Sequence, residues 1–135
     1  MKVLFVAGFS PIVRDVEESK ALYAGALGLP LEGDYPMTDD LEGAKHFGLW
    51  SLEAAAQSCF GASDWPDDVP VPQATVEFEV ADVEEAAREL EARGYALVHG
   101  MKVEPWKQKI ARLLSPDGLL VGLCYTPWFH EEEER

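Results

Sequence analysis

Residues 13–18 read Val-Arg-Asp-Val-Glu-Glu, and a closely similar stretch, Val-Ala-Asp-Val-Glu-Glu, occupies residues 80–85. The second copy begins 67 residues after the first, which is about half of the 135-residue chain. An apolar run precedes each copy and a helix-like run follows it. A repeat at this spacing indicates two modules of the same kind in series.

The run before each copy has the pattern of a β-strand. Residues 74–80 alternate apolar and polar side chains, which is the period of a strand that is buried on one face. Residues 3–13 form the corresponding apolar run in the first half, so we expect a first strand here and not a signal peptide.

The stretch after each copy has the signals of a helix. An Asp stands where the N-cap belongs, and a Glu follows three residues later. Apolar residues then recur at helical spacing until a glycine ends the run. The sequence therefore predicts helices over residues 16–27 and 83–93, capped by Asp15 and Asp82 and ended by Gly28 and Gly94.

Shorter strand-like pieces follow each predicted helix. A Ser-Pro-Asp-Gly turn at residues 115–118 joins the last two. The order is strand, helix and three strands, twice over. The pieces are residues 30–35, 44–50 and 55–60 in the first half, and 96–103, 109–114 and 119–125 in the second.

The chain length is that of one domain. We expect a single domain over residues 1–130, made of two modules at about 1–66 and 73–128 with a Pro-rich linker at 67–72. Residues 131–135 form an acidic tail that we expect to be solvated and disordered.

Composition narrows the class of partner. The net charge of −14 disfavours nucleic acid, because phosphate contacts need Lys and Arg. The same field would concentrate a cationic ligand, or it only keeps the protein soluble. No apolar run is long enough for a membrane span. Cys59 and Cys124 lack metal-type spacing and fit a reduced, cytoplasmic protein.

Taken together, these motifs resemble the vicinal oxygen chelate superfamily, which includes glyoxalase I, extradiol dioxygenases, and fosfomycin and bleomycin resistance proteins. The resemblance implies an α+β fold of two tandem βαβββ modules, whose eight strands form a cleft-shaped, half-open barrel. It also implies a small-molecule ligand and a homodimer. The segments that carry it are Val13 to Ser19, Leu22-Tyr23, Leu27 to Leu29, Val80 to Val83 and Ser115 to Leu123.

Metal-using members of that superfamily place one ligand on each of four strands. The corresponding positions here are Gly8, Gly48, Thr75 and Gly122, which cannot supply imidazole and carboxylate donors. We therefore expect no metal and no other cofactor. His46, two residues before Gly48, is the one alternative donor.

The two other histidines look unsuited to a metal. His99 stands beside Gly100 in an expected turn, and His130 lies in the tail. Neither has a partner at ligand spacing, and no catalytic Ser-His-Asp set, P-loop or dinucleotide fingerprint is recognisable.

Strand alternation selects the residues that would line a cleft around these positions. Four of the candidates below have an alternative role: Trp50 in the core, Trp106 in pinning its loop, and Glu77 at a solvated edge. Arg112 either binds an anionic ligand or pairs with the acidic surface. The candidate ligand-binding residues are Ser10, His46, Trp50, Glu77, Trp106 and Arg112.

Three functions remain open on the sequence. The first is a metal-independent protein that binds an organic ligand, cationic or aromatic, as antibiotic resistance relatives do. The second is a metal-dependent lyase, isomerase or dioxygenase of the same superfamily, with His46 near a carboxylate and a third donor. The third is a regulatory module with a vestigial cleft. The first needs a roomy cleft and the third a collapsed one.

Overall fold

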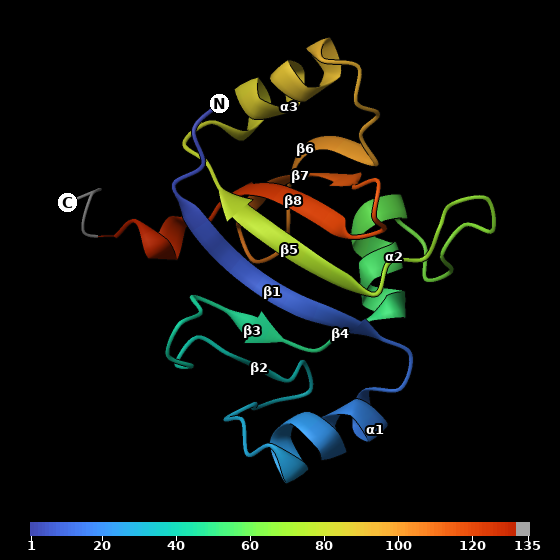
Figure 1. The fold of residues 1–135 in the computed structure, drawn as a ribbon, viewed down its shortest axis with the longest axis vertical. Helices are drawn as coiled ribbons and strands as arrows, with labels where there is room; N and C mark the ends of the chain where they lie inside the picture. The colour runs from blue at the N-terminus through green and yellow to red at the C-terminus, as the bar shows by residue number, and fades with distance from the viewer. Residues whose placement is uncertain (132–135) are drawn as a thin grey trace.

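The computed structural model describes residues 1–131 and has the two-module α+β architecture (Figure 1). The strands are β1 (Phe5–Val13), β2 (Met37–Thr38), β3 (Phe47–Gly48), β4 (Trp50–Ser51), β5 (Ala74–Glu79), β6 (His99–Val103), β7 (Lys109–Leu114) and β8 (Leu120–Tyr125). The helices are α1 (Val16–Lys20), the π-helical turn η1 (Ala21–Ala26), α2 (Leu52–Phe60), α3 (Val83–Ala92) and the 3₁₀ turn η2 (Pro127–Phe129).

The eight strands form one curved sheet that does not close into a barrel (Figure 1). Its order is β2-β3-β1-β5-β8-β7-β6, and β4 pairs with the far end of β1. The two modules join along β1 and β5, which are antiparallel. The predicted fold class and the strand, helix and three-strand order of each module are therefore confirmed.

Both helix starts have the predicted caps. Asp15 accepts a hydrogen bond from the backbone N–H of Glu18 at 3.0 Å, and Asp82 accepts one from Glu85 at 3.0 Å. The helices differ afterwards. α3 buries Val83 and its two central alanines against the sheet, whereas neither α1 nor η1 has a buried residue. The second module thus supplies more of the core than the first.

The prediction of a strand at residues 55–60 is wrong, because this segment belongs to α2. Ser51 caps the helix by accepting a hydrogen bond from the N–H of Ala54 at 3.1 Å, and Gly61 ends it in a left-handed conformation (φ 76°). The intervening Leu-Glu-Ala-Ala-Ala run is rich in strong helix formers. α2 is thus an addition to the expected repeat.

The other strands of the first module are shorter than predicted. Residues 30–35 contribute only an isolated bridge from Glu32 to Met37, and the strand itself is β2. The predicted strand at 44–50 is divided into β3 and β4, which pair with different parts of β1. In the second module, β6, β7 and β8 lie within the predicted ranges.

The two faces of the sheet are covered differently. α3 packs on one face, against Ala111 and Leu123. The opposite face, here the inner face, carries Glu77, Gly122 and Arg112. α2 covers one end of the inner face, where its alanines pack near Leu120, and Phe129 of η2 packs at the other end. The central strip of the inner face lies between these two covers.

No helix within residues 1–131 is both long enough and apolar enough to cross a lipid bilayer.

Candidate functional site

A row of registered residues crosses the inner face from one module to the other. Directly paired residues on neighbouring strands point to the same face of a sheet. Arg112 is opposite both His99 and Gly122, Gly122 is opposite Glu77, and Glu77 is opposite Gly8. Glu77 therefore stands between two glycines at the junction of the modules, and an arginine and a histidine complete the row.

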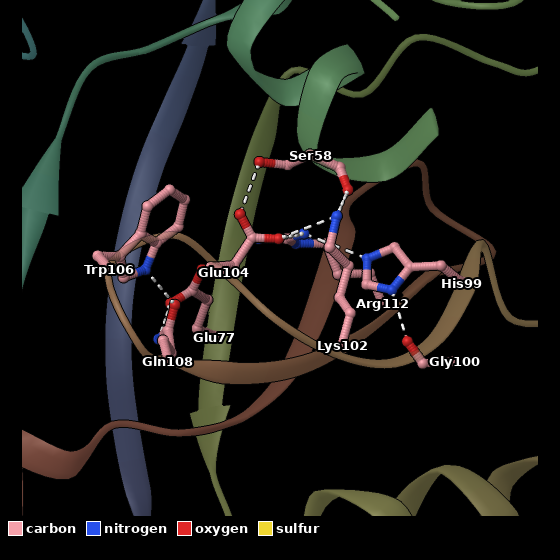
Figure 2. Close-up of polar contacts among 9 residues, drawn as sticks. All are labelled: Ser58, Glu77, His99, Gly100, Lys102, Glu104, Trp106, Gln108 and Arg112. Carbon is pink, nitrogen blue, oxygen red and sulfur yellow. Dashed lines mark hydrogen bonds and ion pairs between the residues drawn. The ribbon is translucent and has the colours of Figure 1, made fainter. Parts of the chain in front are cut away.

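The β6–β7 hairpin carries a tryptophan to this row (Figure 2). The Trp106 side chain is 46% exposed, and its indole N–H donates to Gln108 Oε1 at 3.0 Å. Gln108 Nε2 donates to Glu77 Oε1 at 3.1 Å. A chain of two hydrogen bonds thus fixes an exposed indole beside a half-buried carboxylate.

Gln108 is also hydrogen-bonded on the side away from Trp106, to a buried group of β5 and the segment after β8. Its Nε2 also donates to the Thr126 hydroxyl at 3.0 Å, and that hydroxyl donates to Glu79 Oε1 at 2.9 Å. Glu79 is fully buried and accepts from the backbone N–H of Thr126 at 2.6 Å. Glu79, two residues after Glu77 on β5, therefore does not face solvent.

His130 completes this buried group, although the sequence indicated only a residue of the tail. Its Nε2 lies 2.6 Å from Glu79 Oε2, and the residue is 4% exposed. Its ring stacks on Tyr125, with centroids 4.4 Å apart. Of the predicted tail, Glu131 is exposed, and the remaining residues lie outside the described part of the chain.

Glu104 lies directly after β6, on the other side of the β6–β7 turn from Gln108, and it is the centre of a second cluster (Figure 2). Its carboxylate is almost fully buried and accepts from the Ser58 hydroxyl of α2 at 3.0 Å. It lies 3.3 Å from Lys102 Nζ and 3.4 Å from Arg112 Nη1. Lys102 Nζ also donates to the Ser58 carbonyl, so this cluster ties α2 to the sheet.

Arg112 is buried completely, and only part of its guanidinium is satisfied. Nη1 donates to Glu104 and lies 3.2 Å from His99 Nε2. Cζ lies 5.1 Å from the centroid of the Trp50 ring, a cation–π arrangement. Nε and Nη2 are buried and have no hydrogen-bond partner within residues 1–131.

The charges in this second cluster shift two titratable neighbours. Burial, reinforced by Arg112 and Lys102, lowers the pKa of His99 below its usual value and keeps the ring neutral at pH 7. Burial raises the pKa of the Cys59 thiol, and the nearby Arg112 only partly opposes this effect. The thiol is therefore protonated.

A third feature lies on the other side of the module junction. His46 Nδ1 is 2.7 Å from Asp39 Oδ1. A Cβ on Gly8 would lie 3.3 Å from His46 Cβ, and one on Gly48 would lie 3.4 Å from His46 Nε2. The His46 ring thus covers the two glycines, and the paired carboxylate orients it.

A glyoxalase-like domain model matches residues 7–126, which is most of the chain. The chain belongs to this glyoxalase-like family. No curated protein matches the sequence.

Solved structures of the wider superfamily share the fold. A glyoxalase/bleomycin resistance protein/dioxygenase superfamily member from Vibrio splendidus 12B01 is 17% identical with a TM-score of 0.57, over 90% of this chain and 97% of that one. Methylmalonyl-CoA epimerase from Mycobacterium tuberculosis is 15% identical with a TM-score of 0.61, over 94% and 91%. A hypothetical protein from Bacillus halodurans C-125 is 16% identical with a TM-score of 0.62, over 90% and 93%. At these identities the likeness concerns the fold alone.

The residues of this glyoxalase-like chain do not fit the divalent metal that the superfamily implies. Thr75 is buried and its hydroxyl donates to the Leu120 carbonyl at 2.8 Å. His46 has a carboxylate beside it, but within residues 1–131 no group of three or more His, Cys, Asp and Glu side chains could hold a metal ion. A catalytic divalent site needs at least three such donors.

The space over Gly8 and Gly122, where the resemblance implied a metal, is also occupied. His46 lies over Gly8, and a Cβ on Gly122 would lie 2.9 Å from Ile110 Cδ1 and 3.2 Å from Glu77 Cγ. One hollow, of about 620 Å³, lies instead beside the linker and is lined by Arg14, Leu52, Trp65 and Val69 among others. The small residues at Gly8 and Gly122 therefore do not open a roomy cleft at the centre of the inner face.

The predicted ligand-binding residues fall into separate groups. Glu77 and Trp106 are joined through Gln108, Arg112 stacks on Trp50, and His46 stands with Asp39. Ser10 is only 8% exposed and lies opposite Thr75. Arg112 pairs with a buried carboxylate and not with the acidic surface.

Sequence reasoning missed several polar residues of the inner face. They are Ser58, His99, Lys102, Glu104 and Gln108. Glu104 and Gln108 flank Trp106 in the sequence, and their backbones pair with each other across the β6–β7 turn. His99 lies in β6 and not in a turn.

Proposed function

We propose that this glyoxalase-like protein binds a small organic ligand on its inner face without a metal. The ligand would lie against Trp106 and Glu77 and would carry a cationic group on a flat, aromatic frame. The observation that carries the proposal is the hydrogen-bond chain from Trp106 through Gln108 to Glu77.

This arrangement suits a cationic aromatic group for three physical reasons. An indole face attracts cations and flat rings, and Trp106 exposes one. Glu77 adds a carboxylate on the same row, with its Oε1 held by Gln108. The anchoring of Gln108 by Thr126 preorganises both groups, so little conformational entropy is lost on binding.

The covers at the two ends of the inner face limit the ligand's size. α2 packs near Leu120 and Phe129 packs near Ile110, which leaves the central strip between them. The two hollows described within residues 1–131 lie elsewhere, so the ligand would not fill a roomy cleft and would lie flat against the exposed indole of Trp106.

Titration calorimetry with three matched aromatic compounds tests the proposal: a trimethylammonium, a neutral tert-butyl and a carboxylate derivative of one ring system. We expect the cation to bind most tightly. Trp106→Ala and Glu77→Gln should each weaken its binding about tenfold, which is the scale of one cation–π or ion contact.

Two variants with similar changes elsewhere serve as controls. Trp128→Ala removes an indole that is 41% exposed, and Glu91→Gln removes an exposed carboxylate of α3, on the other face of the sheet. Both should bind the cation as the wild type does. Equal binding of the three compounds, or equal losses in the controls, would contradict the proposal.

A second candidate function, proton transfer, rests on the Asp39–His46 pair. A carboxylate on Nδ1 orients a histidine and supports its Nε2 as a base, which is a recurrent catalytic arrangement. His46 is half-buried, and its Nε2 lies near the Cβ position of Gly48. An isomerase or lyase that removes a carbon-bound proton could use such a base without a metal.

Deuterium exchange separates this candidate from simple binding. Carbon acids such as 2-substituted thioesters would be incubated with the protein in D2O and followed by proton NMR. Exchange that His46→Gln abolishes and Asp39→Asn slows would support an enzyme. Exchange equal to that of the buffer leaves binding as the function.

A further inference from the structure

The cluster under α2 contains an excess of positive charge. Arg112 is fully buried and Lys102 is half-buried, and Glu104 is the carboxylate within 4 Å of both. His99 is neutral, for the reasons given above, and the Cys59 thiol is protonated. Two positive charges therefore face one negative charge in the interior of a strongly acidic protein.

The unsatisfied atoms of Arg112 lie along one edge of its guanidinium. Glu104 and His99 take Nη1, whereas Nε and Nη2 are buried and have no partner within residues 1–131. These two N–H groups are parallel and match the two oxygens of a carboxylate. A buried N–H without a partner costs roughly 1 to 3 kcal/mol, so the edge favours an acceptor.

We propose that the Nε–Nη2 edge of Arg112 binds one carboxylate group of a small organic acid. The carboxylate would accept both N–H groups and balance the excess charge, with the guanidinium still stacked on Trp50. This site is distinct from the proposed cation site at Trp106 and Glu77, and Gly122 lies between Glu77 and Arg112 in the row. It is also independent of that proposed function.

The proposed route for the acid passes Lys102. Lys102 is the outermost charged member of the cluster, with 38% of its side chain exposed, and it bonds to the Ser58 carbonyl of α2. Displacement of Lys102 from Ser58 would open the end of α2 that covers Arg112. Because Arg112 is fully buried, the probe must be small, and formate, acetate and propionate are suitable monocarboxylates.

The test measures thermal stability against sodium formate, acetate and propionate, at constant ionic strength set with sodium chloride. We expect a saturable rise in Tm for the wild type, since a ligand that binds only the folded state stabilises it by mass action. Arg112→Met should abolish the rise. Arg93→Met, which removes an exposed arginine of α3, should retain it.

Further arms define the chemistry. Arg112→Lys should bind carboxylate about tenfold more weakly, because lysine lacks the two parallel donors. Sulfate and phosphate should give smaller rises, since the site offers one edge and one net charge. A rise of equal size with chloride, sulfate and acetate would mean unspecific anion binding and would overturn the proposal.

NMR of the wild-type protein keeps the test independent of variant folding. The Nε–H resonance of Arg112, identified by its loss in Arg112→Lys, should shift saturably as acetate is added. No shift at concentrations that saturate the Tm change would overturn the proposal. Trp106→Ala and Glu77→Gln should leave the acetate response unchanged, so that failure of the cation site is distinguishable from failure of this one.

Discussion

Arg112 and Glu104 form the fully buried ion pair beneath α2, with 3.4 Å between Nη1 and Oε1. Removal of one partner from such a pair leaves the other charge uncompensated. We expect Glu104→Gln to lower the free energy of unfolding by about 3 kcal/mol, because it leaves both Arg112 and Lys102 without a carboxylate.

Arg112→Met should cost less, about 1 kcal/mol, because it also removes two unsatisfied N–H groups and Glu104 keeps Lys102 and Ser58. Urea unfolding in a carboxylate-free buffer measures both values. If Arg112→Met is the more destabilising change, the unsatisfied edge is not a source of instability.

Lys107 is the one residue other than glycine with a positive φ within the described chain, at 79°. A side chain in this conformation costs roughly 1 kcal/mol or more relative to glycine. Lys107→Gly should therefore stabilise the protein by about 1 kcal/mol, seen as a higher urea midpoint. Lys109→Gly, in strand β7, should have the opposite sign, and a loss of stability in both variants would contradict this account of the hairpin.

The depressed pKa of His99 links stability to pH. Burial, and less strongly Arg112 and Lys102, favour the neutral ring in the folded state, whereas the hydrogen bond with the Gly100 carbonyl and, to a smaller extent, Glu104 oppose this effect. The unfolded chain, with a histidine pKa near 6.5, therefore binds the proton more readily, so this contribution is complete above that pH and is lost as the pH falls below it. In His99→Gln, the fall in stability from pH 7 to pH 5 should be smaller than in the wild type. An unchanged slope would show that His99 does not contribute.

Gly122 has little room for a side chain. Its Cβ would lie 2.9 Å from Ile110 Cδ1, the movable end of that side chain. Gly122→Ala should cost about 1 to 2 kcal/mol from overpacking, and Ile110→Val about 1 kcal/mol from lost contacts. Since the valine lacks the clashing methyl, the double variant should be more stable than the sum of the single changes, as a double-mutant cycle can measure. Strict additivity would contradict the proposed clash.

We still expect a homodimer, and we would test its contact in the first module. Large apolar side chains are exposed there: Leu22 at 51%, Leu27 at 60% and Tyr35 at 75%. If a second copy covers these side chains, Leu22→Glu and Leu27→Glu should each disrupt the dimer, because a charged residue would have to be buried in the contact. Sedimentation at micromolar concentration should give a dimer for the wild type and a monomer for the variants. A monomeric wild type would end this expectation.

The repeat and the helix starts were readable from the sequence because they depend on neighbours in the chain. Asp15 and Asp82 each bond to an N–H three residues away. The alternating segment does form β5, but its burial does not alternate, because both faces of the sheet are covered there. α2 was missed although Ser51 and its following alanines carried the helix signal, since the expected third strand of the module was laid over them.

The candidate site depended on tertiary structure. Ser58 and Glu104 are 46 residues apart, Gln108 and Glu77 are 31 apart, and His130 and Glu79 are 51 apart. Alternation assigns a side chain to a face of a strand, but it does not say what will cover that face. Here α2 and η2 closed the two ends of the inner face, buried Arg112 and Glu79, and left Trp106 and Glu77 between them. The physical reason is that a buried charge must be paired, and its partner is set by which segments pack against it. In this fold those partners come from segments that are distant in the sequence.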